Sequence, residues 1–211
     1  MKSLLLLCLT LPVVELFAKE NKWLKKEAAY GKYSYYKMQV YDEQSMASFY
    51  KLEAIRQAVE PDSLDMHLLN ACLFYATNKL RALNNLTPFI IDEQLKDASA
   101  THSFQMAQHH FFDHTNMYES SLRTPEKRLS TFGIQYSYEG ENCHRVYISE
   151  VEMTYIELAQ QVIQSLYNSA PHRANMLNKK FKYGACAVAV EKKDSDLYLI
   201  VTQNFYANGT F

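Results

Sequence analysis

The sequence predicts an α+β fold, a three-layer α-β-α sandwich with an N-terminal helical extension. The first observation behind this prediction is a series of segments whose apolar residues recur at three- and four-residue steps, which is the helical period. The second is a pair of segments near the end of the chain, residues 185–190 and 197–202, that are apolar at successive positions. Antiparallel strands usually leave one face in water, so strands that are apolar on both faces need helices above and below them.

The composition is that of a globular protein with a real core. Hydrophobic residues make up 48% of the chain and charged residues 21%, both ordinary values for such proteins. The net charge of -1 gives no reason to expect nucleic acid or an anionic membrane surface as a partner. Composition leaves the oligomeric state open.

The first residues have the layout of a secretory signal peptide. Lys2 is followed by an apolar run over residues 3–14, and residues 16–18 resemble a cleavage site before the charged Lys19. The run is too short to span a bilayer, and Cys8 lies inside it rather than at its end, where a lipidated cysteine would stand. We therefore expect a signal peptide over residues 1–18, no transmembrane anchor, and a secreted or periplasmic protein. The alternative is a buried N-terminal helix.

The next segment, residues 19–62, is interpreted as a Tyr-rich helical extension of a main domain over residues 63–211. Residues 45–59 have helical spacing, and Pro61 is expected to stop that helix. The tyrosines of the extension either pack against the main domain or recognise a partner. They are Tyr30, Tyr33, Tyr35, Tyr36 and Tyr41.

Four helices are predicted in the main domain. Residues 69–83 carry an apolar face that ends before Asn84 and Asn85, and residues 92–106 follow with Asp92 as N-cap. Residues 124–133 open on Thr124-Pro125 and close at a glycine, while residues 154–168 form the fourth helix. Two strands, residues 185–190 and 197–202, are then joined by a polar turn over residues 191–196.

Several short motifs occur in a fixed order along this domain. They are ATHSFQMA at residues 100–107, FFDHTN at 111–116, TPEKR at 124–128, GENCH at 140–144, SAPHRANML at 169–177 and VTQNFY at 201–206. In this order they resemble the CAP superfamily, also called SCP/TAPS, which includes cysteine-rich secretory proteins, antigen 5 and pathogenesis-related proteins. The likeness is to the bacterial branch. It implies an α-β-α sandwich, which agrees with the fold argued above from the strands.

The resemblance also implies a cleft lined by up to two His and two Glu, a cluster that binds a divalent metal in some members. By motif, these residues are His114, Glu141 and His172, with Asn142 beside them. The second Glu of the family would precede the second His, but residues 166–169 contain no acid. Pro171 also stands where the family has Gly, and Leu166 where Trp is common.

Two imidazoles and one carboxylate suffice for zinc with an open water position. Without metal, Glu141 and a neighbouring His could act as an acid/base pair. The alternative is that Glu141 and Asn142 only brace a strand. We assign no catalytic residue and favour a binding module for a small hydrophobic ligand or a protein partner, either of which the resemblance implies. If the chain is an enzyme, a metal-assisted hydrolase would use His114, Glu141 and His172. A third interpretation is a structural envelope protein with a vestigial cleft.

Other candidates fit structural roles. His102 lies on the core face of its helix and is interpreted as a hydrogen-bonded interior residue. Arg128 and Arg173 are interpreted as donors that brace loops. Removal of the signal peptide leaves Cys72, Cys143 and Cys186, an odd number that cannot all pair within one chain.

Overall fold

The computed structural model describes residues 35–208. The predicted signal peptide and the tyrosines Tyr30 and Tyr33 lie outside the described residues. Within residues 35–208, no helix is both long enough and apolar enough to cross a bilayer.

The helices and strands of the described part are named by their order along the chain. The α-helices are α3 Val40–Glu43, α4 Met46–Phe49, α5 Met66–Leu83, α6 Glu93–His109, α7 Pro125–Thr131, α8 Tyr155–Asn168 and α9 Ala170–Met176. The strands are β1 Tyr138–Tyr147, β2 Tyr183–Lys193 and β3 Asp196–Ala207. Single π or 3-10 turns occupy Tyr35–Gln39, Ala54–Arg56, Pro61–Ser63 and Ser120–Leu122.

The helices begin where the sequence provides caps. Asp65 accepts a hydrogen bond from the amide of Leu68 at the start of α5, and Asp92 does the same for Leu95 in α6. Thr154 and Glu157 form a complete capping box on α8. The main helices therefore fall close to the positions predicted from apolar spacing.

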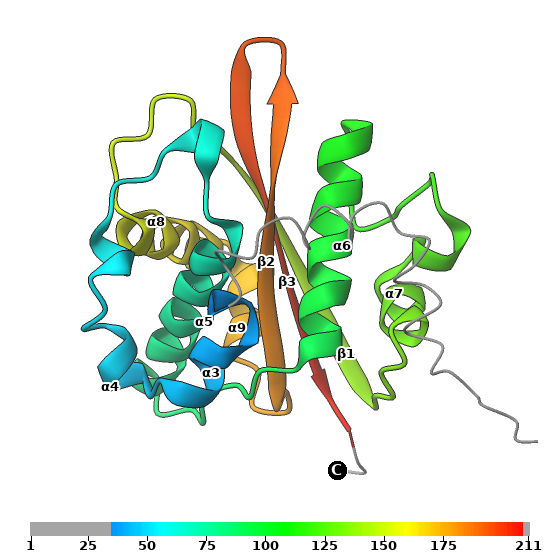
Figure 1. Cartoon of the computed structure of the whole chain (residues 1–211). Coiled ribbons are helices and arrows are strands. Elements are labelled where there is room, and N and C mark those ends of the chain that lie inside the picture. Colours follow the sequence, from blue (N-terminus) through cyan, green and yellow to red (C-terminus); the bar gives the residue numbers. More distant parts are fainter. Residues whose placement is uncertain (1–34, 209–211) are drawn as a thin grey trace, which may run out of the picture.

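The sheet is antiparallel, with β3 between the edge strands β1 and β2 (Figure 1). The predicted hairpin is confirmed, but its strands run further than predicted, and only residues 194 and 195 are left in the turn. Asp194 adopts a left-handed conformation there, with φ of 57°. Glu191, predicted in the turn, remains in β2 because its buried carboxylate is held by Arg145 at 2.8 Å and His110 at 3.0 Å.

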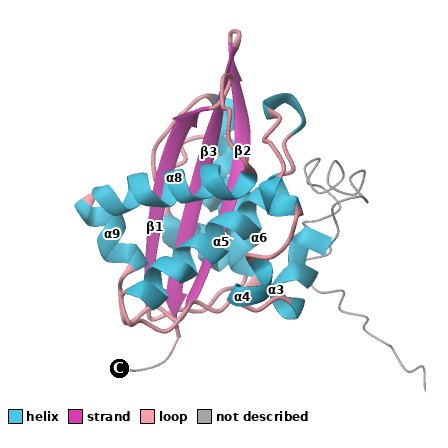
Figure 2. Cartoon of the chain, turned by 90° about the vertical axis from the view of Figure 1, so that its left-hand side faces the viewer, coloured by secondary structure: helices cyan, strands magenta, loops and turns pink. Residues whose placement is uncertain are grey.

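Helices cover both faces of this sheet, so the predicted three-layer sandwich is confirmed. Helices α3, α4, α5 and α8 lie on one side, and α6 and α7 lie on the other (Figure 1). Figure 2 shows α5, α8 and α9 in front of the sheet and α6 behind it. Almost every residue of β3 is buried, as the two-sided apolar pattern required.

The two faces of β2 differ in side-chain size. Cys186 and Val188 belong to the large core shared with α5 and α8, whereas Ala185 and Ala189 face the α6 side. Small side chains allow a helix to lie close to the sheet. This closeness is used by Ser103 of α6, whose hydroxyl bonds the carbonyl of Ala187 at 3.0 Å.

The described part of the extension belongs to the main core. Its apolar residues pack in the same cluster as α5 and α8, and the most buried have exposed fractions of 4% or less. They are Val40, Phe49, Ile55 and Val59. Tyr41 packs edge-on against Phe74 with ring centroids 5.2 Å apart, which favours packing as the role of that tyrosine.

The prediction of one helix over residues 45–59 is wrong. After α4 the chain leaves helical geometry, because Arg56 donates to the carbonyls of Tyr50 and Leu52 and draws the segment into a compact turn. The amide of Val59 then bonds the carbonyl of Met153, which ties the segment to the start of α8. The apolar spacing marked buried positions correctly, but these contacts decided the backbone.

Candidate functional site

The candidate site lies at the edge strand β1. Successive side chains of a strand point to opposite faces, so Glu141 and Asn142 serve different sides of the sheet. Glu141 is 8% exposed and pairs in register with Asn204 of β3. His114 comes from the loop after α6, and His172 comes from α9.

Glu141 is held by a buried arginine. Arg128 of α7 is fully buried, and its Nη2 lies 2.7 Å from both Oε1 and Oε2 of Glu141. The same guanidinium donates to the carbonyls of Leu122 at 2.8 Å and His114 at 3.0 Å. The predicted loop-bracing role of Arg128 is therefore confirmed, while its pairing with Glu141 was not predicted.

His114 contacts the same carboxylate, at an oxygen that Arg128 also contacts. Helix α6 ends at His109 because His110 takes a left-handed conformation, with φ of 54°, and the chain turns toward β1. The Nδ1 of His114 lies 2.9 Å from Oε1 of Glu141, and 51% of the His114 side chain is exposed. The imidazole is thus fixed at Nδ1, with half of its side chain open to solvent.

The two groups shift each other's pKa in opposite directions. The hydrogen bond to Glu141 raises the pKa of His114 above its ordinary value, against the opposing effect of partial burial. Burial alone would raise the pKa of Glu141, but the hydrogen bond from His114 and the charges around the carboxylate outweigh it, so this pKa is lowered. A carboxylate with a lowered pKa is a weak base.

A second set of potential ligand atoms surrounds Glu141. One atom each from His102, Glu141 and Cys143 lies within 4.8 Å of the others, and all three residues are buried. His102 is neutral at physiological pH, since burial lowers its pKa to about 4, and its Nε2 lies 3.1 Å from the carbonyl oxygen of Asp113. This agrees with its predicted interior role.

This buried set fits a metal ion poorly. Burial raises the pKa of the Cys143 thiol well above its ordinary value, so the thiolate that a metal would need does not form readily. The carboxylate of Glu141 already accepts from Arg128 and His114. A cation would have to compete with the adjacent guanidinium.

His172 enters the site from the other face of β1. Its carbonyl accepts a hydrogen bond of 3.1 Å from Nδ2 of Asn142, a residue that is 1% exposed. Partial burial lowers the pKa of His172, and the nearby charge of His114 lowers it further. Within residues 35–208, the His172 ring makes no hydrogen bond to His114 or Glu141.

The four predicted residues therefore form two contacts. His114 and Glu141 touch directly, and Asn142 contacts the main chain of His172. The exposed edge of His114 and the ring of His172 are the imidazoles that a zinc ion would contact, with Glu141 orienting His114 from behind. Because the pKa of His114 is raised, zinc would have to displace its proton.

Glu139 is a further acidic residue near the site that sequence reasoning missed. Burial and the charges of Glu126 and Glu141 raise its pKa to about 7, and its Oε2 is buried without a hydrogen-bond partner within the described residues. The signal was available in the sequence, because residues 139 and 141 of one strand share a face.

The described cysteines are all free thiols. Cys72, Cys143 and Cys186 are buried, and none is joined in a disulfide.

A three-stranded sheet between two helical layers, with a His–Glu pair at its edge, defines the CAP class of domain. The chain belongs to the cysteine-rich secretory protein family (CAP), whose sequence pattern matches residues 74–205.

Two bacterial relatives carry this comparison further. The chain is 32% identical over 107 residues to "Uncharacterized protein YkwD" of Bacillus subtilis, which corresponds to 51% of this chain and 37% of that protein. The crystal structure of an extracellular protein containing a SCP domain from Bacillus anthracis is similar with a TM-score of 0.53 and 26% identity, over 71% of this chain and 44% of that one. The chain thus spans less than half the length of either relative.

A third similar structure shares the fold. It is an outer surface protein from Borrelia burgdorferi, with a TM-score of 0.52 and 14% identity, over 72% of this chain and 98% of that one.

Proposed function

We propose that this protein is an exported CAP-domain binding module that engages a protein partner through the loop around His114. The observation that carries the proposal is the exposure of three large apolar side chains in that loop. Phe112, Met117 and Tyr118 are 46%, 66% and 58% exposed. Aromatic residues and methionine are enriched where proteins meet each other.

The exposure of these side chains favours a protein partner over a small hydrophobic ligand. A pocket for a small ligand is concave and buries most of its occupant. Side chains that stand about half open to solvent instead offer area to a second surface. Tyr118 is also pre-positioned, because its ring stacks on His109 at a centroid distance of 4.2 Å.

The state of Glu141 argues against Glu141 itself as the general base of a hydrolase. A general base needs a pKa near the working pH, whereas the pKa of Glu141 is lowered and both of its carboxylate oxygens are paired with Arg128. In this proposal Glu141 is a positioning residue that holds His114 at the surface.

Export is part of the proposal. It is supported by the signal-peptide pattern at residues 1–18, and by the description of the Bacillus anthracis relative as extracellular and of the Borrelia burgdorferi relative as an outer surface protein.

The partner proposal is tested by affinity capture from the extracellular fraction of the source cells. We expect one protein to be retained in stoichiometric amount by the wild type and lost with Phe112→Ser/Met117→Ser. The matched control is Leu83→Ser, because Leu83 is 74% exposed at the C-terminal end of α5, outside the loop around His114. Equal capture by the loop variant and the control, or no stoichiometric partner, contradicts the proposal. A fatty acid or sterol that co-purifies and is lost with the same loop variant would favour the small-ligand interpretation.

Metal dependence is tested separately by zinc calorimetry on the wild type, His114→Ala and His172→Ala. We expect one zinc ion to bind the wild type and neither variant. Absence of heat in the wild type excludes metal dependence and leaves the partner proposal standing. Turnover of a peptide or ester library that disappears with Glu141→Gln would instead establish the hydrolase.

A test of the interpretation as a structural envelope protein requires a deletion shorter than the whole extension. Removing residues 19–62 would also remove Val40, Phe49, Ile55 and Val59 from the core. Deleting only residues 19–34 leaves these four core residues in place. Loss of the captured partner with this deletion, and not with the loop variant, would favour docking through the extension.

A further inference from the structure

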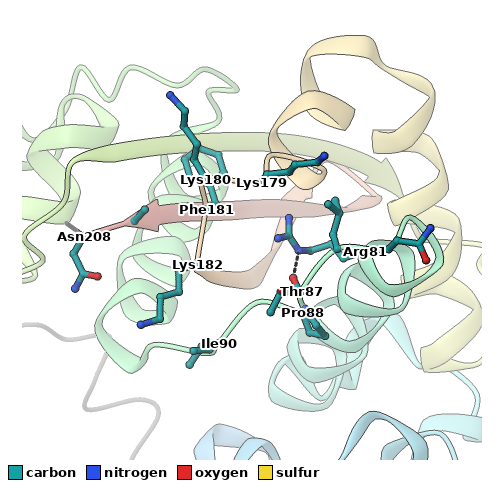
Figure 3. A pocket seen from close by; sticks show the side chains of 12 residues that line it. Arg81, Thr87, Pro88, Ile90, Lys179, Lys180, Phe181, Lys182 and Asn208 are labelled. Carbon is teal, nitrogen blue, oxygen red and sulfur yellow. Dashed lines mark hydrogen bonds between the residues drawn. The ribbon is translucent and has the colours of Figure 1, made fainter. Parts of the chain in front are cut away.

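A pocket with a concentration of positive charge lies apart from the His114 site. It forms where the segment after α5, the loop between α9 and β2, and the end of β3 meet (Figure 3). Its volume is about 540 Å³, within the range of small-molecule sites. None of the residues of the candidate functional site lines it.

The charge of this pocket is of one sign. Among the described residues, four cationic side chains line it, and no Asp or Glu does. They are Arg81, Lys179, Lys180 and Lys182. Within residues 35–208, none of the three lysines forms an ion pair. In a chain whose net charge is -1, such a cluster concentrates positive potential in one place.

Arg81 makes the floor of the pocket rigid. It is 2% exposed, and its guanidinium donates to the carbonyls of Thr87 at 2.8 Å, Met176 at 2.8 Å and Asn178 at 3.1 Å. These carbonyls belong to both rims, so one buried side chain joins the two segments that form the walls. The guanidinium also lies 3.7 Å from the ring centroid of Phe89.

The lysines stand on ordered main chain. The amide of Lys180 bonds Oδ1 of Asn178 at 2.9 Å, and the amide of Lys182 bonds the carbonyl of Tyr206 at 3.1 Å. Two ammonium groups lie over aromatic rings, Lys180 at 4.3 Å from the centroid of Tyr138 and Lys182 at 5.2 Å from that of Tyr183. A ring face attracts a cation without neutralising it, so the charge remains available to a ligand.

We propose that this basic pocket binds a phosphorylated ligand through Lys179, Lys180 and Lys182. A phosphate group offers several anionic oxygens, which suit ammonium groups that act as point charges on flexible stems. Figure 3 shows the three ammonium groups pointing in different directions from the pocket, so in this proposal the exposed lysine side chains turn toward the ligand when it binds. The pocket is larger than one phosphate requires, and its rim includes Pro88 and Ile90, the latter 48% exposed. The ligand therefore carries a carbon skeleton beside its phosphate, as in a phosphorylated small molecule or a phospholipid headgroup.

Binding is measured on the full chain with defined probes. Calorimetry uses glycerol 3-phosphate and inorganic pyrophosphate, and co-sedimentation uses phosphatidylglycerol vesicles against phosphatidylcholine vesicles. We expect saturable binding of a phosphate probe that weakens with added salt. Binding of glycerol 3-phosphate in solution identifies a free ligand as the source. Binding confined to phosphatidylglycerol vesicles identifies a headgroup.

Variants test whether binding depends on the pocket or only on the overall charge of the protein. Lys180→Gln/Lys182→Gln is expected to lower affinity at least about tenfold. The matched control, Lys192→Gln/Lys193→Gln, removes the same charge from the exposed hairpin end and is expected to bind like the wild type. Arg81 is left unchanged because it holds the walls together. An equal loss in both variants, or no saturable binding of any probe up to about 10 mM, overturns the proposal. His114→Ala is expected to retain phosphate binding, so this result is independent of the proposed partner site.

Discussion

The Nη2 atom of Arg128 lies 2.7 Å from both carboxylate oxygens of Glu141, and both side chains are buried. In this pair the positive charge of Arg128 balances the buried negative charge of Glu141. The free side of the cluster is therefore the imidazole of His114, which Glu141 holds through Nδ1.

Removing the positive charge of Arg128 should destabilise the folded protein. We expect Arg128→Met to lower the free energy of unfolding by about 3–5 kcal/mol, because Glu141 would be left buried without its main cation. Arg128→Lys keeps the charge but cannot make the same set of contacts, so a loss of about 1–2 kcal/mol is expected. Urea denaturation measures both variants.

Two further variants test the cause of that loss. Arg123→Met, at an exposed position in the preceding turn, should leave the free energy of unfolding nearly unchanged. The double variant Arg128→Met/Glu141→Gln should recover part of the lost stability, because it also removes the unpaired charge. A double variant as unstable as the sum of its parts would show that the ion pair is not the cause.

The pH dependence of stability should report the His114–Glu141 contact. The pKa of His114 in the folded protein lies above its ordinary value of 6.5, so the folded state holds the proton more tightly than the unfolded state does. The contribution of His114 is thus complete below about pH 6.5 and is lost as pH rises through the folded pKa. Because the side chain is half exposed, we expect under about 1 kcal/mol.

The difference in unfolding free energy between the wild type and His114→Gln isolates this contribution from the other histidines. It should be largest near pH 5.5 and shrink toward about pH 8.5. An NMR titration of the His114 ring provides the folded pKa directly. A difference that stays constant with pH, or a ring pKa at or below the ordinary value, would contradict the assigned contact.

The three buried cysteine thiols should not react with thiol reagents while the protein is folded. Burial raises the pKa of Cys143 well above the ordinary value and that of Cys186 to about 11, and the thiolate is the reactive form. With Cys8→Ser to remove the thiol of the predicted signal peptide, we expect almost no reaction with a disulfide reagent at pH 7 and three reactive thiols in urea. Rapid labelling of Cys143 without urea would show that the site opens more than its burial indicates.

The sandwich was predictable because its cause is local. Strands that are apolar on both faces require two covering layers wherever the rest of the chain lies, and the helical faces were readable from spacing. The contact of His114 with Glu141 was not local, and it was anticipated only through the resemblance of the FFDHT and GEN motifs to a known family.

Other features depend on tertiary contacts that no spacing encodes. Nothing near Arg128 in the sequence indicates that its guanidinium would meet Glu141 across the turn before β1. The failed helix over residues 45–59 shows the same limit, because buried residues at helical spacing also suit an irregular segment whose carbonyls bond Arg56. Spacing predicts which side chains are buried better than it predicts the backbone between them.

Asn142 should control the position of His172. Its Nδ2 donates to the carbonyl of His172 and to Oε1 of Gln203, both at 3.1 Å, and its Oδ1 accepts from Asn175 at 2.9 Å. Asn142→Ala removes all three bonds, so we expect a loss of about 1–3 kcal/mol in the free energy of unfolding. Asn142→Asp keeps the shape but places a buried carboxylate against two acceptor oxygens. Burial and these acceptors disfavour its charged form, so its pKa in the folded protein would be raised.

The stability deficit of Asn142→Asp should therefore grow as pH rises above about 4, where the unfolded state ionises first. Asn168→Asp is the matched control, since the exposed Asn168 side chain accepts a hydrogen bond from Gln164 on the surface of α8 and should show no such trend. If zinc binds the wild type, Asn142→Ala should also weaken it by about tenfold or more, because a displaced α9 moves His172. Denaturation at about pH 4 and pH 7 with both aspartate variants is decisive. A parallel response of the two would mean that Asn142 does not fix the position of α9.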